Sequence, residues 1–255
     1  MNVIARINEL LEKGETFCLV TVMASDLPHI SSGRKTIVLA DGSVEATLGD
    51  PQLDLRLQQL AMAALDQGKS ASVEMEGGVR LFLDILSSAA TLLVCGAGHI
   101  AVPLVRFANE VGFSVTVLDD RSDFAHPSRF PGCNVIAENF TIALQDMRLG
   151  RATFVVIITR GHEHDVDCLT EILKKETAYV GLIGSRRRVQ FVLEWLEKNG
   201  FPRQRLQEVF TPIGIPIGAE SPEEIALCIV SELVCVRRKG AQQARALRAA
   251  IGIDP

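Results

Sequence analysis

The sequence has no long apolar run, no excess of basic residues and no segment with the features of a signal peptide. Its apolar runs all fall short of the ~20 residues needed to cross a bilayer. Its net charge is −5, with 26 basic and 31 acidic side chains among 255 residues, so no overall positive field favours nucleic acid. Residues 1–14 form a mixed amphipathic pattern rather than a signal peptide. We therefore expect a soluble cytoplasmic protein that binds neither membrane nor nucleic acid.

The cysteines also lack the patterns of metal or redox sites. Six are present, with no CxxC pair and no zinc-site spacing. Four lie in apolar stretches, where a reduced thiol in a protein core is the simpler interpretation. The sequence thus predicts no metal site. These four cysteines are Cys95, Cys168, Cys228 and Cys235.

The first 88 residues predict a small α+β domain. Asp41-Gly42 and Glu76-Gly77-Gly78 each separate two apolar runs, a pattern typical of β-hairpins. Residues 87–90, Ser-Ser-Ala-Ala, are expected to join this domain to the next. The expected elements are helices over 3–13 and 52–67, with strands at 17–24, 35–40, 43–48, 71–75 and 79–85.

Residues 89–238 predict a second domain in which strands and helices alternate. Such alternation indicates a Rossmann-like, doubly wound parallel sheet, here in the order 3-2-1-4-5-6, so the fold class is α/β. Ser221, Pro222 and Glu224 predict a capping box that starts the last long helix. Residues 239–255 are expected to form a helical tail that supports a homodimer. The expected strands lie at 92–95, 114–118, 134–137, 153–158, 179–183 and 208–211.

A glycine-rich turn follows the first strand of this second domain. Residues 96–101, Gly-Ala-Gly-His-Ile-Ala, fit G-x-G-x-x-A, and the next strand ends at Asp119, 21 residues after Gly98. Gly96 permits the tight turn, and Gly98 lets the backbone approach a pyrophosphate at the start of a helix near His99 or Ile100. The pattern predicts a dinucleotide site; the alternative is a Rossmann-like unit that holds no ligand.

The residues after the second strand bear on which dinucleotide fits. Asp119 is placed to accept hydrogen bonds from both hydroxyls of an adenosine ribose, which favours NAD. Arg121 lies two residues on and can pair with a 2′-phosphate, which favours NADP. Phe124 either covers the adenine or only belongs to the connecting loop. The choice between NAD and NADP stays open.

Polar segments follow three strands of the predicted sheet, and the topology places them at one edge. Ser185 is expected to cap a helix whose first turn holds Arg186, Arg187 and Arg188. Cations there oppose the helix dipole unless an anion binds, so we predict an anion site to which one or two of these arginines point. A solvated basic turn is the alternative. The three segments are 96–99, 159–165 and 184–188.

The segment 159–165, Thr-Arg-Gly-His-Glu-His-Asp, contains two histidines and an acid. His162 can contact a ligand or act as an acid or base, and it is the one catalytic candidate. Asp165 is equally suited to cap the next helix, and His164 to lie at the surface. A metal is the least favoured interpretation, because the spacing provides no third ligand.

Four segments follow one another in this order: CGAGHIAVPL; VTVLDDR, with Phe124 and Arg129-Phe130-Pro131 after it; TRGHEHD with YVGLIGSRRR; and PIGIPIGAESPEEIALCIVSELV. Together they resemble the XdhC/CoxI family, the xanthine dehydrogenase accessory proteins. The resemblance covers 91–238, and GLIGSRR followed by IGAESPEEIA is far more specific than the glycine motif.

The resemblance implies a maturation factor that binds the molybdenum cofactor, assists its sulfuration and delivers it to a molybdenum hydroxylase, with a sulfurtransferase as a further partner. It thus implies a cofactor-binding chaperone rather than a stand-alone enzyme. Gly96, Gly98, His99, Asp119, Asp120 and Arg121 match the family's nucleotide-binding part, and His162, Asp165, Ser185, Arg186 and Arg187 match its second polar cluster.

The sequence departs from the family in its first domain. Members usually have a Gly-Gly-Cys after the first hairpin, whereas residues 43–57 here read SVEATLGDPQLDLRL. A cysteine contact to molybdenum from this position is therefore excluded. Two other functions stay open: an NAD(P)-dependent oxidoreductase and a nucleotide-sensing interaction module.

Overall fold

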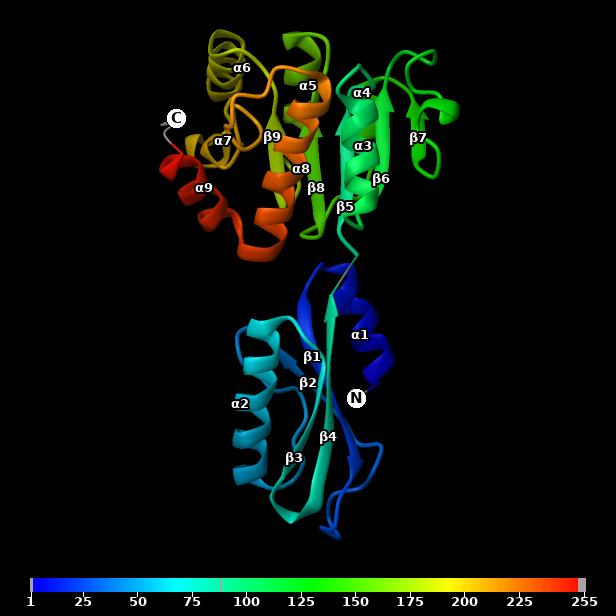
Figure 1. The fold of residues 1–255 in the computed structure, drawn as a ribbon, viewed down its shortest axis with the longest axis vertical. Coiled ribbons are helices and arrows are strands. Elements are labelled where there is room, and N and C mark those ends of the chain that lie inside the picture. Colours follow the sequence, from blue (N-terminus) through cyan, green and yellow to red (C-terminus); the bar gives the residue numbers. More distant parts are fainter. Residues whose placement is uncertain (1, 88, 252–255) are drawn as a thin grey trace. The chain divides into compact units, whose positions relative to one another are not determined.

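The computed structural model describes residues 2–87 and 89–251 of the chain, which divides into two compact units, 1–88 and 89–255 (Figure 1). Residue 88 in the predicted joint and residues 252–255 of the predicted tail lie outside the described residues. None of the helices within the described ranges is both long enough and apolar enough to span a bilayer.

The first unit contains a four-stranded antiparallel sheet in the order β2-β1-β4-β3. Residues of β1 alternate between two hydrophobic cores. Cys18 and Val20 pack in one core with residues of α2, whereas Phe17 packs in the other with Leu10 of α1. The elements are α1 (Val3–Glu12), β1 (Thr16–Ala24), β2 (Lys35–Leu39), α2 (Pro51–Gln67), β3 (Ala71–Met75), the short 3-10 turn Glu76–Gly78 and β4 (Val79–Ser87).

The strand predicted at 43–48 is wrong. Within this described segment, only Val44 forms a bridge, to Val38. Beyond it, the carboxylate of Asp54 accepts hydrogen bonds from the Leu48 N–H, at 2.6 Å, and from the Thr47 hydroxyl. The side chain of Asp54 thus takes the place of a strand partner, as aspartate can when it competes for backbone donors.

The second unit is a Rossmann-like α/β domain and confirms the predicted fold class. Its five parallel strands lie in the order β7-β6-β5-β8-β9, so the strand order reverses between β5 and β8. The elements are β5 (Thr91–Cys95), α3 (Ala101–Glu110), β6 (Ser114–Asp119), a 3-10 turn (Pro127–Arg129), β7 (Asn134–Ala137), α4 (Phe140–Asp146), β8 (Thr153–Ile157), α5 (His162–Ile172), β9 (Tyr179–Leu182), α6 (Arg186–Lys198), α7 (Arg203–Gln207), α8 (Pro222–Lys239) and α9 (Ala241–Ala250).

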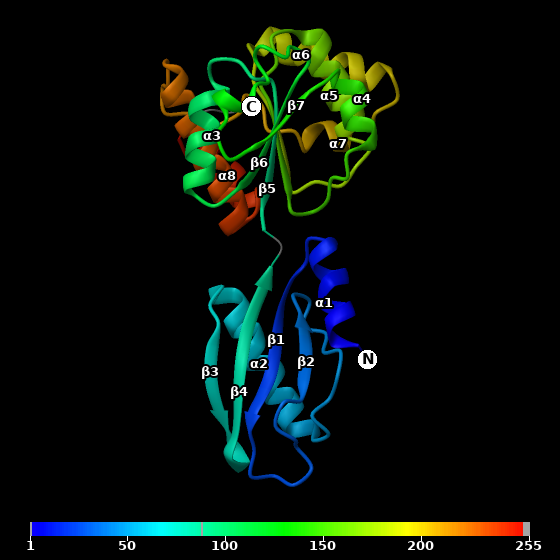
Figure 2. The same cartoon turned by 90° about the vertical axis from the view of Figure 1, so that its right-hand side faces the viewer.

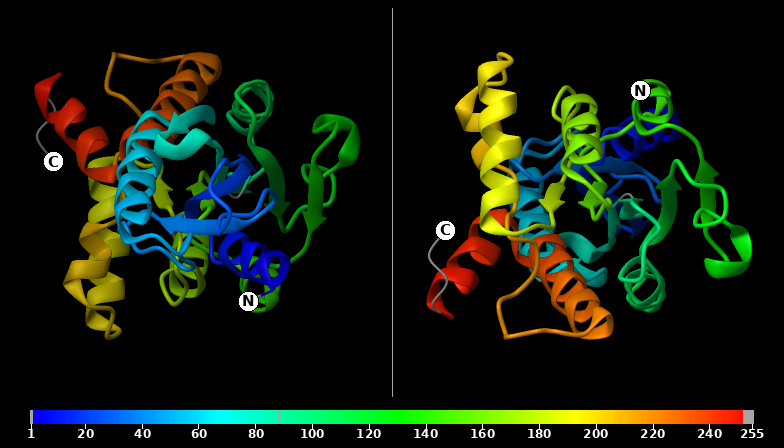
Figure 3. Two further views of the ribbon diagram at one scale, coloured as in Figure 1. Left: turned by 90° about the horizontal axis from the view of Figure 1, so that it is seen from below. Right: turned by 90° about the horizontal axis from the view of Figure 1, so that it is seen from above.

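Helices cover both faces of this sheet. Figure 2 shows α3 and α8 on one face and α4 to α7 on the other. Because both faces are covered, the central strands are mostly apolar, and all five residues of β8 are buried. Figure 3 shows α6 (yellow) and α9 (red) toward the β9 edge, with β7 (green) at the opposite edge.

The sixth strand predicted at 208–211 is also wrong. Phe210 forms an isolated parallel bridge with Gly181 of β9, and the residues before it form the short helix α7. The edge of the sheet beyond β9 is therefore covered by only a short length of extended chain.

Helix α9 is tied to the sheet domain through a buried carboxylate. Glu232 of α8 is fully buried, and it accepts hydrogen bonds from the Gly214 N–H at 3.1 Å and from Arg248 of α9 at 3.0 Å. The hydroxyl of Tyr179 in β9 donates to the same carboxylate. A buried carboxylate needs such partners, because an unpaired buried charge is strongly destabilising.

The predicted capping box of α8 is confirmed, and it provides a test of the fold. Ser221 accepts from the Glu224 N–H at 3.2 Å, and the Glu224 carboxylate accepts from the Ser221 N–H at 3.0 Å. We expect Ser221→Ala to lower the free energy of unfolding by about 1 kcal/mol in urea titrations. Ser221→Asn, which keeps a cap, should retain most of the stability; an equal loss in both variants would contradict the capping role.

Candidate functional site

The glycine turn has the backbone shape that the sequence predicts. Gly96 has φ +112, and a Cβ there would lie 2.5 Å from the backbone oxygen of Ile158, so only glycine fits. A Cβ on Gly98 would meet nothing within 4 Å. Gly96 is thus required by the fold, whereas Gly98 leaves one side of the backbone open.

Helix α3 begins at Ala101, one or two residues later than predicted, with Ile100 at its N-cap and no side chain as a cap. Within the described part of the chain, the backbone N–H groups of Gly98 and His99 donate to no partner. Free N–H groups at a helix N-terminus attract anions, because the helix dipole adds about half a positive charge there.

Asp119 fastens the turn to the end of β6. Its side chain is 1% exposed, and its Oδ2 accepts from the Ala97 N–H at 2.7 Å. The Nε and Nη2 atoms of Arg121 donate to Oδ1 and Oδ2 at 2.8 and 2.9 Å, and the Arg121 N–H donates to Oδ1 at 3.1 Å. A carboxylate has about four acceptor sites, so Asp119 has none left for a ribose in this conformation.

The electrostatics of Asp119 follow from these contacts. Burial on its own would raise the pKa of the Asp119 carboxyl. The Arg121 guanidinium and the two backbone N–H donors outweigh burial, and they hold the pKa below its ordinary value of 3.8. Asp119 is therefore ionised at neutral pH.

Arg121 and Arg129 both lie on the loop side of the turn. The Arg121 guanidinium stacks 3.7 Å from the ring centre of Phe124. Arg129 donates to the carbonyl oxygens of Ala97 and Phe124 at 2.8 and 2.6 Å. The ring of Phe124 thus packs against Arg121, and its carbonyl oxygen accepts from Arg129. No motif in the sequence indicates that Arg129 binds the glycine turn.

A second ion pair spans the carboxyl end of β5. Arg160 follows β8, and its Nη2 donates to Oδ2 of Asp120, which follows β6, at 2.8 Å. Because β5 lies between these two strands, the pair joins the two sides of the glycine turn. The hydrogen bond from Arg160 lowers the pKa of Asp120 to about 2.

The start of α5 differs from the prediction for Asp165. Gly161 is the N-cap, and Asp165 lies inside the helix and fully buried, so the capping interpretation is wrong. Its carboxylate accepts from the Thr159 hydroxyl at 2.7 Å and from Arg188 at 2.6 Å. Burial nevertheless raises the pKa of Asp165, because it outweighs both partners.

The two histidines of this segment lie against rings of other helices. His162, the first residue of α5, is exposed and meets Phe191 of α6 edge-on at 5.1 Å between ring centres. His164 lies 5.4 Å from the ring of Phe140. No group of three or more His, Cys, Asp or Glu residues placed to hold a metal occurs among residues 2–87 and 89–251.

The arginines at the start of α6 diverge. Ser185 caps the helix as predicted, accepting from the Arg188 N–H at 3.3 Å. Arg188 points to Asp165 and the Thr159 carbonyl, whereas Arg186 lines a separate pocket and Arg187 is exposed. Arg188 is the one that joins the segments after β8 and β9, and the run of three arginines in the sequence could not single it out.

The structure therefore brings most of the predicted residues to the carboxyl edge of the sheet. Contacts from Asp119 to Ala97, from Asp120 to Arg160 and from Asp165 to Arg188 connect the segments that follow β5, β6, β8 and β9. The edge presents open backbone at Gly98, with paired charges beside it. This arrangement suits a phosphate-bearing ligand.

Comparisons with known proteins agree with this fold. Residues 92–233 match the sequence model of the XdhC Rossmann domain, and residues 10–76 match that of the XdhC and CoxI family. The second match falls in the first unit, where the sequence lacks the Gly-Gly-Cys.

Two curated proteins are similar in sequence. The uncharacterized protein YqeB of Escherichia coli K12 is 25% identical over 253 residues, which is 93% of this chain and 46% of that protein. A protein of Bacillus subtilis 168 named as a probable xanthine dehydrogenase subunit is 30% identical over 164 residues, which is 62% of this chain and 46% of that protein. The chain spans less than half the length of these relatives.

One crystal structure is similar over nearly the whole chain. It is that of a xanthine dehydrogenase from Bacillus halodurans, with a TM-score of 0.57 and 20% identity, covering 98% of this chain and 99% of that chain. At this identity, the similarity concerns the fold alone.

The role of Asp119 in fastening the turn can be tested by removing its charge. We expect Asp119→Asn to lower the free energy of unfolding by about 1.5–3 kcal/mol at pH 7, because hydrogen bonds from a guanidinium are lost. The lowered pKa means that the contribution of ionised Asp119 is present above the ordinary pKa of 3.8 and is lost as the pH falls through the folded value. The difference between wild type and variant should therefore shrink between pH 7 and pH 3 in urea titrations. Asp123→Asn, at an exposed position in the same loop, serves as the control; equal losses in both variants would contradict this role.

Proposed function

Because this chain belongs to the XdhC and CoxI family, we propose that it is an accessory protein of a molybdenum hydroxylase related to xanthine dehydrogenase. The name of the Bacillus subtilis relative supports this proposal. In this proposed role, the chain binds the molybdenum cofactor as cargo, assists the sulfuration of the cofactor and delivers it to the hydroxylase. A sulfurtransferase and a second copy of this chain are further partners in this proposal. Leu247 of α9 is 39% exposed and provides apolar surface for contact with the second copy.

The open backbone of the glycine turn carries the ligand part of the proposal. Gly98 leaves free space beside the backbone, and the N–H groups of Gly98 and His99 have no partner within the described residues. A phosphate fits such donors, whether it belongs to an NAD(P)-type dinucleotide or to the pterin of the molybdenum cofactor. A bound dinucleotide would supply hydride transfer, whereas the molybdenum cofactor would be held as cargo.

The adenosine side of a dinucleotide needs a rearrangement of side chains. Asp119 meets a ribose hydroxyl only when Arg121 turns away, because Arg121 occupies its acceptor sites. Asp120 is less buried, with a side chain 24% exposed, and becomes an acceptor once Arg160 releases it. We propose that these two arginines control access to the carboxylates.

The side chains around the turn suit binding better than catalysis. His162 is exposed and rests on Phe191, and Cys95 at the end of β5 is fully buried. Asp165 forms an ion pair with the Arg188 side chain, and Ser185 caps α6 by accepting from the Arg188 N–H. Arg187, exposed at the start of α6, remains a proposed phosphate contact. The chemistry in this proposal therefore belongs to the cargo and its client rather than to this chain.

Substituting Gly98 tests the ligand site. A Cβ there meets no protein atom within 4 Å, so Gly98→Val should fold normally while its side chain fills the space of a phosphate. We expect wild type to bind NAD in calorimetry, or to retain molybdenum cofactor in gel filtration, and Gly98→Val to weaken either at least about tenfold, which corresponds to about 1.4 kcal/mol. Circular dichroism and thermal unfolding provide the control for folding.

Each outcome of this experiment has a meaning. Wild type that binds neither ligand, or a folded Gly98→Val variant that binds as wild type does, would falsify the proposed site. Retention of molybdenum cofactor supports the accessory role. Substrate-dependent change in reduced nicotinamide absorbance would instead favour an oxidoreductase, and tight NAD binding without turnover or pterin affinity would favour a sensing module.

The ion pair over the turn gives a second prediction. If Arg160 must leave Asp120 before a dinucleotide binds, Arg160→Ala should tighten NAD binding about two- to fivefold, since a solvent-exposed pair is worth about 0.2–1 kcal/mol. Arg151→Ala is a control, because Arg151 precedes β8, at the opposite end of that strand from Arg160, and pairs with Glu176 in a more exposed ion pair. Weaker NAD binding by Arg160→Ala would show that Arg160 contacts the ligand and would contradict the gating role.

A further inference from the structure

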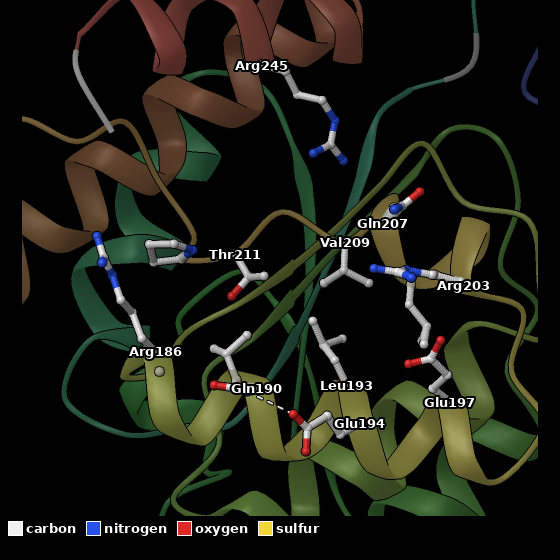
Figure 4. A pocket seen from close by; sticks show the side chains of 14 residues that line it. Arg186, Gln190, Leu193, Glu194, Glu197, Arg203, Gln207, Val209, Thr211 and Arg245 are labelled. Carbon is white, nitrogen blue, oxygen red and sulfur yellow. Dashed lines mark hydrogen bonds between the residues drawn. The ribbon is translucent and has the colours of Figure 1, made fainter. Parts of the chain in front are cut away.

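A cavity of about 630 Å³ lies beside β9, at the edge of the parallel sheet (Figure 4). It is bounded by α6, α7, the segment 209–212 and Arg245 of α9, and its lining includes no residue of the glycine turn 96–101. Its volume falls within the range of about 300–1,000 Å³ common for small-molecule sites.

The reduced sixth strand explains how the cavity arises. After the bridge between Phe210 and Gly181, the chain makes a further hydrogen bond to β9, from the Ile213 N–H to the Leu182 carbonyl at 3.2 Å, but it forms no regular strand. Val209 and Thr211 face α6 across open space. Val189 and Leu193 of α6 face them from the other side. The cavity therefore has an apolar floor, formed by Val189, Leu193, Leu206 and Val209.

Three arginines line this cavity without a matching acid. Arg186, Arg203 and Arg245 have no carboxylate at ion-pair distance within the part of the chain that the structure describes. Arg186 is in the first turn of α6, where a cation is unfavourable unless an anion lies near. Arg245 is exposed, its guanidinium rests 4.1 Å from the ring centre of Phe210, and it donates to the Glu208 carbonyl oxygen at 2.7 Å.

Thr211 adds an independent observation. Its hydroxyl oxygen is buried and has no hydrogen-bond partner among the described residues. Figure 4 shows Thr211 projecting from the segment after α7 toward the space above α6. A buried hydroxyl without a partner is unfavourable, and rotation of the Thr211 side chain toward the cavity would let a ligand oxygen satisfy it.

The two acids of the lining lie further along α6. Glu194 accepts from Gln190 at 2.8 Å, and Glu197 lies near the end of the helix. Arg186 and Glu197 are eleven positions apart on α6, which corresponds to about 16 Å at 1.5 Å per residue. Along α6, the two acids of the lining thus lie at the opposite end from Arg186.

We propose that this cavity is a second binding site, for a small organic anion in which a phosphate or carboxylate is attached to a flat or apolar body. The anion lies between Arg186, Arg245 and the Thr211 hydroxyl, and the body lies over Leu193 and Val209. The site does not require a ligand at the glycine turn, so it stands or falls separately from the proposed function.

Phenyl phosphate and benzoate are suitable probes, with benzyl alcohol as the uncharged match. We expect calorimetry to detect binding of at least one anion and none of the alcohol; which anion binds better tells a phosphate from a carboxylate ligand. NAD at saturation should leave this binding unchanged. No binding of either anion, or displacement by NAD, would overturn the proposal.

Thr211→Val removes the hydroxyl and keeps the shape of the side chain. We expect it to weaken binding of the anion at least about fivefold and to raise the thermal unfolding midpoint of the free protein, because an unsatisfied hydroxyl is removed. Thr170→Val is the matched control, since the Thr170 hydroxyl is also buried without a partner in the described structure but lies on α5, outside the cavity. It should raise the midpoint and leave binding unchanged; equal binding by both variants would contradict the site.

Filling the cavity gives a test that does not depend on one hydrogen bond. Gln207→Trp, at an exposed position of α7 that lines the cavity, should abolish binding, whereas Gln204→Trp on the same helix, outside the lining, should bind as wild type does. Circular dichroism shows whether both variants fold. Binding retained by folded Gln207→Trp would overturn the proposal.

Discussion

The buried carboxylate of Asp119 is the contact on which the carboxyl edge of the parallel sheet depends. It joins the end of β6 to the glycine turn through the Ala97 N–H, and it holds Arg121 in place. Without the Asp119 carboxylate, the glycine turn would lose its side-chain contact with β6. The Arg121 guanidinium would also lose its carboxylate partner. A residue at the position where dinucleotide folds bind a ribose thus serves in this conformation as a structural anchor.

The contacts of Asp119 leave the glycine turn with free backbone donors on one side and paired side chains on the other. On one side, Gly98 offers open backbone and free N–H groups, which need no rearrangement to meet a phosphate. On the other, Arg121 and Arg160 cover two carboxylates. A ligand that is mainly a phosphate meets only the first side, whereas a full dinucleotide must also open the second. If the proposed ligand site is correct, the cost of that opening favours a phosphate ligand over a full dinucleotide.

The sequence predicts the architecture well where the pattern is local and repeated. Alternating apolar strands and helices predict the order of the first five strands, and Ser185 and Ser221 predict two helix starts. The strand predicted at 43–48 is not continued beyond the bridge at Val44, where the Asp54 side chain accepts from the Leu48 N–H. No periodicity reveals such competition by a side chain.

The candidate site is less predictable, since it depends on the directions of side chains. The run of arginines at 186–188 indicates an anion site but not that Arg188 pairs with buried Asp165 while Arg186 faces another cavity. The pairing of Asp120 with Arg160 joins residues forty positions apart, and only the strand order brings them together. Which of these residues binds a ligand stays a prediction.

The attachment of α9 has a practical consequence for handling the protein. Arg248 reaches from this helix to the fully buried Glu232 and to the carbonyl of Pro212, so residues 241–250 are an integral part of the sheet domain. A deletion that ends the chain after Lys239 would remove Arg248 and leave the buried Glu232 carboxylate without this partner. A shortened version made for crystallisation or fusion should therefore keep this last helix intact.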